Sequence, residues 1–309
     1  KVPSITALRK RYNEVGFVSP VKILSEKDAK FHRKEIEQVE KKIGSVHNIN
    51  KIHTILTSTF KIAKNKKIID LVKDIIGPNL LLYNATYLIK EVNDPTYVSW
   101  HQDLTYWGFS HDDVVSVWLA FSPTNKISGG MQMLPSSHKN GRLSHKITSN
   151  KDNMLLQGQT VENVNEDTSV FCSLLPGEAS FHHGWTLHSS LPNKSQDRRI
   201  GLNLHYLASH VKQTKHNLDT ALCISGKDEY KNAWVFTGAD SIVKTFKKAR
   251  ENFNLMESGQ ALPFPPRPPS IFTVTSGGDR ITIDWSGESD SEPGMDGYNL
   301  YRLKFKPDT

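Results

Sequence analysis

Cysteine is scarce in this sequence, with only Cys172 and Cys223 among 309 residues. Two cysteines cannot build a disulfide framework, and this pair lacks the repeated short spacing of a zinc site. The sequence also lacks the run of about 18 apolar residues that a membrane-spanning helix requires. These absences exclude a disulfide-stabilised scaffold and predict a chain without a membrane partner, in a reducing compartment that we take to be the cytoplasm.

Residues 1–4 contain no apolar core of an export signal. The first residue is not Met, so a removed leader or a trimmed terminus stays open. Lys and Arg number 39 against 32 Asp and Glu, a formal charge of +7, and stretches such as 61–67 carry much of the excess. A solvated helix face explains such stretches best, so we expect no nucleic-acid partner; attraction of an anionic substrate is the second explanation.

The first 79 residues read as a helical scaffold. Helices are expected at 4–16, ending at a glycine, from the capping segment 25–28 onward with Phe31, Ile36 and Val39, and at 62–76 before Gly77 and Pro78. The length of the chain and its 37% hydrophobic residues suffice for one large domain with a small appendage.

From residue 80 the hydrophobic period changes to alternation. In 80–90 it puts Leu82, Asn84, Thr86 and Leu88 on one face, and the two polar residues there suggest a polar cavity. Many short strands separated by turns predict a mainly β fold with flanking helices: a double-stranded β-helix, or jelly roll, with N-terminal helices packed on it. Further strands are expected at 113–121, after the turn at 128–130, and at 169–175, 179–188 and 199–207. The core with its C-terminal helical segment would span 80–262, with a helix at 240–253.

A proline-rich stretch at 263–270 predicts a semi-rigid linker. Residues 271–309 form a small β segment with three alternating stretches, and they resemble the first half of a fibronectin type III module. Trp285 and Tyr301 would then take core positions of that module. These 39 residues are too few for the whole sandwich, so either the module is truncated or its strands dock on the main domain.

The aromatic-rich segment 97–107 contains His101, Gln102 and Asp103. In an extended chain, His101 and Asp103 point to the same face and Gln102 to the other. With a second histidine they would make the facial triad of two histidines and one carboxylate that binds Fe(II) in non-heme oxygenases. A chance His-x-Asp is expected about once among 13 histidines, however, and His111 with Asp113 forms such a pair.

A third ligand could come from several downstream histidines, each of which could instead be a hydrogen-bonded structural residue. A buried arginine would need a carboxylate partner. Either Arg198 or Arg199 could be such an arginine, because side chains alternate along a strand and only one of the two can point into the cavity. The candidate histidines are His182, His183, His188, His205 and His210.

Taken together, the segments 77–79, 100–104, 128–130 with 134–138, and 188–199 resemble the phytanoyl-CoA dioxygenase family of Fe(II)/2-oxoglutarate oxygenases over about residues 76–210. The resemblance implies that His101, Asp103 and His188 bind Fe(II), and that Arg199 binds the distal carboxylate of 2-oxoglutarate. It implies no catalytic residue beyond the metal ligands. Further cosubstrate contacts implied by position are Gln102, Ser190, Trp118 and Thr86.

The activity implied is hydroxylation of an aliphatic C–H bond, in which 2-oxoglutarate and O₂ become succinate and CO₂. Halogenating relatives replace the carboxylate ligand, whereas Asp103 is present here. An acyl-CoA 2-hydroxylase of the phytanoyl-CoA type, a jelly-roll protein that binds metal or ligand without catalysis, and an adhesion protein acting through the tail are the alternatives.

No coenzyme A signature is visible, so we expect a small polar or anionic metabolite as substrate. The aromatic residues between 93 and 109 could form a wall or lid over it, or simply fill the core. The residues expected to line the substrate pocket are Asn84, Tyr97, Tyr106, Trp107 and His182. The sequence does not indicate an oligomeric state.

Overall fold

The computed structural model of the chain describes residues 5–148, 150–155, 159–215, 221–228 and 230, and the backbone of 273–277 and 280–284. The chain divides into two units, Lys1–Lys248 and Ala249–Thr309. Each is described by itself below. Among the described residues, no helix is long and apolar enough to cross a bilayer.

The N-terminal part of the first unit is largely helical, as predicted. Its helices are α1 (Ile5–Val15), α2 (Glu26–Ile43), α3 (Thr57–Ala63) and α4 (Lys66–Ile76), with a short 3-10 helix, η1 (Ile52–Thr54). Ser25 caps α2 by accepting a hydrogen bond from the Asp28 amide. The run expected at 62–76 is two helices, because Asn65 caps the second one. Phe31 is 57% exposed and takes no part in the core.

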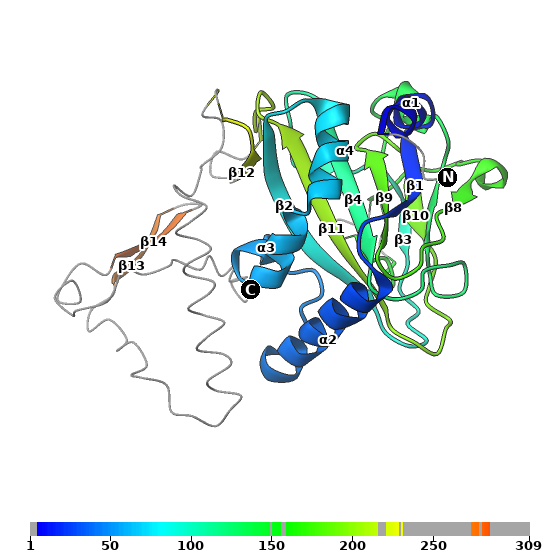
Figure 1. Ribbon diagram of the computed structural model, residues 1–309, viewed down its shortest axis with the longest axis horizontal. Coiled ribbons are helices and arrows are strands. Elements are labelled where there is room, and N and C mark those ends of the chain that lie inside the picture. The colour runs from blue at the N-terminus through cyan, green and yellow to red at the C-terminus, as the bar shows by residue number, and fades with distance from the viewer. Residues whose placement is uncertain are drawn as a thin grey trace. The chain divides into compact units, whose positions relative to one another are not determined.

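Two antiparallel sheets form the centre of this unit (Figure 1), which confirms the mainly β fold with flanking helices. The six-stranded sheet has the order β1 (Phe17–Lys22), β9 (Glu178–His183), β4 (Val114–Ala120), β11 (Arg199–Ala208), β2 (Leu80–Lys90), β12 (Leu222–Ser225). The four-stranded sheet has the order β3 (Val98–His101), β10 (His188–Ser190), β5 (Met131–Met133), β8 (Val170–Phe171). The smaller elements are α5 (Leu104–Trp107), η2 (Ser137–Asn140), η3 (Glu166–Thr168) and the pair β6 (Lys146–Ile147) with β7 (Gln159–Thr160).

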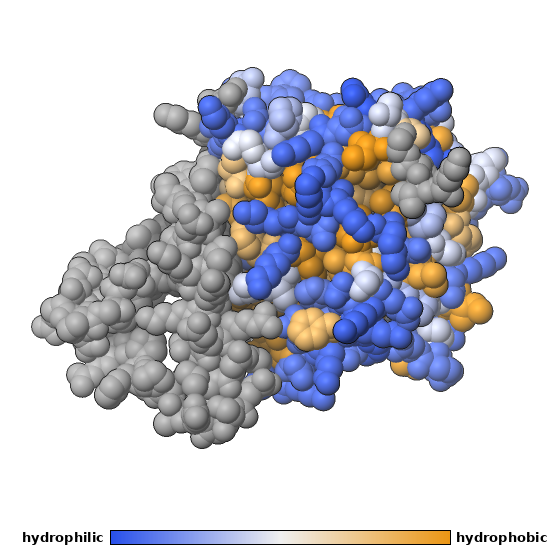
Figure 2. Space-filling model, viewed as in Figure 1, coloured by the Kyte–Doolittle hydropathy of each residue, from blue (hydrophilic) through white to orange (hydrophobic). Residues whose placement is uncertain are grey.

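The two faces of the six-stranded sheet differ in character. The outer face, with residues such as Leu202, Leu204 and Tyr206, packs under the helices in the largest apolar cluster. Figure 2 shows this helix-covered side, where polar side chains cover most of the surface and apolar ones appear between them. The inner face contributes Trp118 to a cluster with Met131 and Met133 of β5, so it faces the four-stranded sheet.

The strand expected at 179–188 is in fact two strands in different sheets. β9 ends at His183 and β10 begins at His188, with a turn at 184–187 between them. His182 and His188 therefore lie on opposing sheets. The edge strands β1 and β12 were not predicted; β1 contains Pro20, which an edge position tolerates.

The predicted face of 80–90 is wrong at Leu82. A β-bulge at Tyr83 shifts the pairing of β2 with β11 between Tyr206 and His205. Asn84, Thr86 and Leu88 stand opposite inner-face residues of β11, whereas Leu82 stands opposite Tyr206 and joins the outer core. A bulge adds one residue to a strand, so the side chains beyond it change faces.

In the second unit, β13 (Thr273–Gly277) pairs with β14 (Arg280–Asp284) as an antiparallel hairpin. These strands overlap the first two stretches expected in the tail, at 270–275 and 280–285. The third strand, the linker at 263–270, the helix at 240–253, Trp285 and Tyr301 lie outside the described residues.

Candidate metal and cosubstrate site

Strand pairing brings His101, Asp103 and His188 together between the two sheets. His188 begins β10 directly opposite His101, the last residue of β3. Asp103 follows the strand in a helical turn, and the Leu104 amide donates to the carbonyl of Gly184 in the turn before β10. The extended chain expected through Asp103 is therefore wrong, because β3 stops at His101. The turn nonetheless delivers the carboxylate to the two imidazoles.

The three side chains offer ligand atoms that all lie within 4.8 Å of one another. Asp103 Oδ1 is 3.4 Å from His101 Nε2 and 3.7 Å from His188 Nε2. Each of the three residues is at most 7% exposed. Two imidazoles and one carboxylate on one side of a site leave the remaining coordination positions of a divalent iron open to other ligands.

Backbone carbonyls fix the tautomers of both histidines. His101 Nδ1 is 2.8 Å from the Ser99 carbonyl, and His188 Nδ1 is 2.9 Å from the Thr186 carbonyl. A carbonyl can only accept, so each Nδ1 carries the proton and each Nε2 presents a lone pair toward Asp103. Burial lowers the pKa of His188 well below its usual value, which favours the neutral form that binds metal. This donor set fits Fe(II).

The outer oxygen of the Asp103 carboxylate has its own partners on the six-stranded sheet. The Ser116 hydroxyl donates to Oδ2 at 2.7 Å, and His182 Nε2 lies 3.4 Å from it. His205 Nε2 is 4.0 Å away. Oδ2 is therefore engaged, while Oδ1 faces the two ligand histidines.

Two rows of mainly polar side chains cross the inner face of the six-stranded sheet, and the residues of each row are paired across neighbouring strands. The first row contains His182, Ser116, His205 and Asn84, from β9, β4, β11 and β2 in turn, and its first three members lie within 4.0 Å of Asp103. The second row contains Ser180, Trp118, Asn203 and Thr86. Ser180 Oγ, Asn203 Oδ1 and both ring nitrogens of His205 are buried without a hydrogen-bond partner. Unpaired buried polar atoms are costly, so these rows are suited to contacting a polar ligand.

Arg199 lies on the same inner face, at the start of β11. It is 3% exposed, its Nε has no hydrogen-bond partner, and its guanidinium lies 5.3 Å above the Trp118 ring. A Cβ at Gly201 would come within 1.9 Å of that indole, so only glycine leaves room for the ring. Burial lowers the pKa of Arg199 to about 10, still well above neutrality. A buried guanidinium without an anion is poorly compensated, so Arg199 fits a carboxylate ligand.

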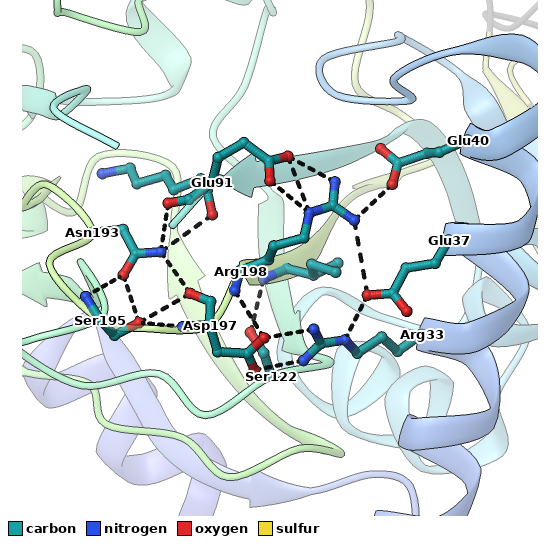
Figure 3. Close-up of polar contacts among 11 residues, drawn as sticks. Arg33, Glu37, Glu40, Glu91, Ser122, Asn193, Ser195, Asp197 and Arg198 are labelled. Atoms are coloured by element: carbon teal, nitrogen blue, oxygen red, sulfur yellow. Dashed lines mark hydrogen bonds and ion pairs between the residues drawn. The ribbon is translucent and has the colours of Figure 1, made fainter. Parts of the chain in front are cut away.

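Arg198, the rival of Arg199, points out of the sheet toward α2 (Figure 3). Its guanidinium donates to Glu91 and to Glu40 at 2.8 Å. Beside it, Arg33 of α2 binds Asp197 through two hydrogen bonds of 2.7 Å. Arg198 is thus engaged in ion pairs, which leaves Arg199 as the arginine on the side of the site.

The comparisons with known proteins identify the family. The family model described as phytanoyl-CoA dioxygenase (PhyH) matches residues 3–201. The chain belongs to the phytanoyl-CoA dioxygenase family. It is 26% identical over 181 residues to a probable alpha-ketoglutarate-dependent hypophosphite dioxygenase of Stutzerimonas stutzeri, covering 57% of this chain and 63% of that protein. With the peroxisomal phytanoyl-CoA dioxygenase of Homo sapiens it shares 22% identity over 228 residues, covering 65% and 68%.

Solved structures show the same fold. The apo form of the non-heme monooxygenase ThoJ has a TM-score of 0.66 at 23% identity, covering 82% of this chain and all of that one. CytC3 with Fe(II) and alpha-ketoglutarate has a TM-score of 0.56 at 20% identity, covering 74% and 91%. The chain spans less than two thirds of the length of the hypophosphite dioxygenase and about two thirds of the human enzyme.

Gln102 was expected to contact the cosubstrate, but both the nitrogen and the oxygen of its side-chain amide bond to the protein itself. Its Nε2 donates to the carbonyls of Gly141 and Trp185, both at 2.8 Å, and its Oε1 accepts from the Leu143 amide. It is fully buried. These contacts tie the loop after η2 to the turn before β10.

The residues expected to line the substrate pocket are spread over three places. Asn84 and His182 lie in the first row, and the Trp107 ring packs 4.4 Å from that of His205. The Tyr106 ring lies 6.2 Å from that of His101, and its buried hydroxyl has no partner. Tyr97, in contrast, bonds through its backbone to Asp152 and Met154.

Three residues with contacts at the site were missed as such from the sequence. Ser116 contacts Asp103, the bulge residue Tyr83 packs against Trp107, and Lys90 donates to Ser190, which was expected at the cosubstrate. Ser116 and Lys90 have no local motif that marks them. Their positions follow from strand register, which a single sequence does not specify.

Proposed function

We propose that the chain is an Fe(II)/2-oxoglutarate-dependent dioxygenase that hydroxylates an aliphatic C–H bond of a small metabolite. The observation that carries this is the buried triad of His101, Asp103 and His188, with both imidazole lone pairs turned toward Asp103 Oδ1. The second support is Arg199, a buried guanidinium whose Nε has no hydrogen-bond partner and could bind an anion. Relatives named as alpha-ketoglutarate-dependent enzymes agree with it.

In this proposal the three triad side chains hold Fe(II), which would supply the activation of O₂ coupled to decarboxylation of 2-oxoglutarate. Arg199 binds the distal carboxylate of the cosubstrate, and Ser190, Trp118 and Thr86 are further proposed contacts of the cosubstrate. Gln102 supports the site by fixing the two loops that it joins.

The proposed substrate is small and anionic. Lys51 lies beside the β2 bulge, with its Nζ 3.0 Å from the Tyr83 carbonyl and 4.5 Å from the centre of the Tyr83 ring. This positive charge and the polar first row support an anion with hydrogen-bonding groups. The relative named as a hypophosphite dioxygenase supports the same class of substrate.

Both cysteines are free thiols, which supports a reducing compartment such as the cytoplasm. Imaging of the tagged chain in cells would check this.

The test is release of succinate and consumption of O₂ by the Fe(II)-loaded protein with 2-oxoglutarate and a panel of metabolites. The panel should include small phosphorus oxyanions, amino-acid derivatives and an acyl-CoA, so that an acyl-CoA hydroxylase would also be detected. Turnover should fall at least about a hundredfold in His101→Ala, because the metal loses a ligand.

The matched control is His111→Ala, which alters the other His-x-Asp of the chain. His111 is exposed and lies outside the triad, so this variant should keep normal turnover. Iron-loaded protein that binds ligand but never converts 2-oxoglutarate with any compound would instead favour a non-catalytic binding protein.

A further inference from the structure

Two buried basic side chains stand side by side at the end of the β2–β11 pair. Lys90 is directly opposite Arg199, so both side chains lie on the inner face. They are 0% and 3% exposed. Among the described residues, Asp103 is the only buried carboxylate, and it belongs to the triad. The protein thus places two basic groups together, and the carboxylate that acts on both of them, that of Asp94, is only partly buried.

Lys90 also contacts a strand of the opposing sheet. Its Nζ donates to the Ser190 hydroxyl at 2.9 Å and to the carbonyl of Leu191. A hydroxyl that accepts from an ammonium has its own proton left to donate to another group. Ser190 is 6% exposed, and no described acceptor takes that proton.

If Lys90 only anchored the backbone of Leu191, the free-energy cost of burying its amino group would have no other return in binding. Burial, with Arg199 beside it, lowers the pKa of Lys90 to about 6. A neutral side chain could fill the same space without this electrostatic cost. A carboxylate bound beside Lys90 and Arg199 would remove this cost, because it would raise the pKa of Lys90 and keep its ammonium form beside the guanidinium.

We propose that Lys90 is a positioning residue for the distal carboxylate of the cosubstrate. Resting on the function proposed above, it directs the Ser190 hydroxyl proton toward that carboxylate and adds a second positive charge beside Arg199. The ligand recognised here is a 2-oxo acid with a second carboxylate. A 2-oxo acid with one carboxylate gains nothing from either contact.

The experiment compares two cosubstrates by calorimetric titration of the Fe(II)-loaded protein without O₂. One is 2-oxoglutarate, and the other is 2-oxovalerate, which has the same chain length but lacks the distal carboxylate. The ratio of their Kd values measures recognition of that carboxylate alone. Lys90→Met should reduce the preference for 2-oxoglutarate about tenfold and leave the Kd of 2-oxovalerate unchanged. Lys90→Arg should retain most of the preference, because it keeps the charge.

Lys22→Met is the matched control. Lys22 of β1 likewise donates to a backbone carbonyl, that of Pro176, but it is exposed and at the other edge of the sheet. Its loss should leave the ratio unchanged. Should Lys90→Met not fold, Ser190→Ala applies the same test, since it removes the hydroxyl that Lys90 directs.

An unchanged ratio in a folded Lys90→Met protein would overturn the inference, as would equal weakening of both cosubstrates, which is the mark of simple anchoring. In either case the proposed function would stand, because the unaltered protein would still prefer 2-oxoglutarate. If the unaltered protein binds no 2-oxoglutarate, the proposed function fails and this inference with it.

Discussion

The carboxylate of Asp103 has different neighbours at its two oxygens. Oδ1 faces the ligand imidazoles, whereas Oδ2 accepts a 2.7 Å hydrogen bond from Ser116. Because Ser116 stands on β4, this bond joins the candidate metal site to the six-stranded sheet. Partners that hydrogen-bond to a metal ligand orient it, and their loss typically costs about 10- to 100-fold in metal affinity or activity.

Ser116→Ala should therefore weaken metal binding about tenfold while the protein stays folded. The carboxylate would lose the donor that keeps Oδ2 turned away from the metal, and His182 at 3.4 Å would be its closest remaining partner. Titration with Mn(II), followed by calorimetry, measures the change. Ser128→Ala, in a buried turn away from the triad, is the control. Equal Mn(II) affinity in both variants would show that Ser116 does not orient Asp103.

The sequence alone predicted the residues that carry a motif. The resemblance to the family implied roles for His101, Asp103, His188 and Arg199, and the structure brings the first three together. Ser116 and Lys90 could not be found in this way. A serine within a strand and a lysine at its end look the same whether they face solvent or a buried site, and only long-range pairing decides which.

At the scale of elements, two local breaks in regular structure build the site. The turn at 184–187 sends the chain from one sheet to the other, so His182 supports Asp103 while His188 completes the triad. The bulge at Tyr83 turns Asn84 toward the first row and Leu82 toward the helices. Hydrophobic alternation could not predict either break, because both 80–90 and 179–188 read as single continuous strands.

Helix α2 fixes the chain just before Arg199 through the ion pairs in Figure 3. Arg198→Ala should lower the free energy of unfolding by about 1 to 2 kcal/mol, because it removes partners from Glu40 and Glu91 together. It should also weaken 2-oxoglutarate binding a few-fold, since the start of β11 loses its attachment to α2. Urea unfolding and calorimetry measure the two effects.

Arg9→Ala is the matched control for that variant. Arg9 forms a single long contact of 3.9 Å with Asp74 and is 53% exposed, so its loss should change stability by less than about 0.5 kcal/mol. High salt should reduce the difference between the two variants, because it screens partly exposed pairs. Equal stability of both variants would show that α2 and the β11 start are held by packing alone.

At the scale of the whole molecule, the sequence predicted the two-sheet architecture but not the edge strands of the larger sheet. The change from helical to alternating period near residue 80 falls where β2 begins, although β1 lies within the part that was expected to be helical. The strands β1 and β12 escaped prediction because each lies at an edge of the sheet, where one side lacks a strand partner and the hydrophobic pattern is weak. Such strands are specified by the sheet that they join more than by their own residues.

All residues of the candidate site lie in the unit Lys1–Lys248, so a chain ending at residue 248 should keep the proposed activity. Its melting temperature, its Mn(II) affinity and its 2-oxoglutarate affinity should match those of the full chain within about twofold for each binding constant. A chain ending at residue 221 is the informative contrast, because it also loses β12, which pairs with β2 at Leu81 and Leu82. That shorter chain should be clearly destabilised, since the β2 edge would be exposed. Loss of activity with intact metal binding in the chain ending at 248 would instead assign the functional role to the tail.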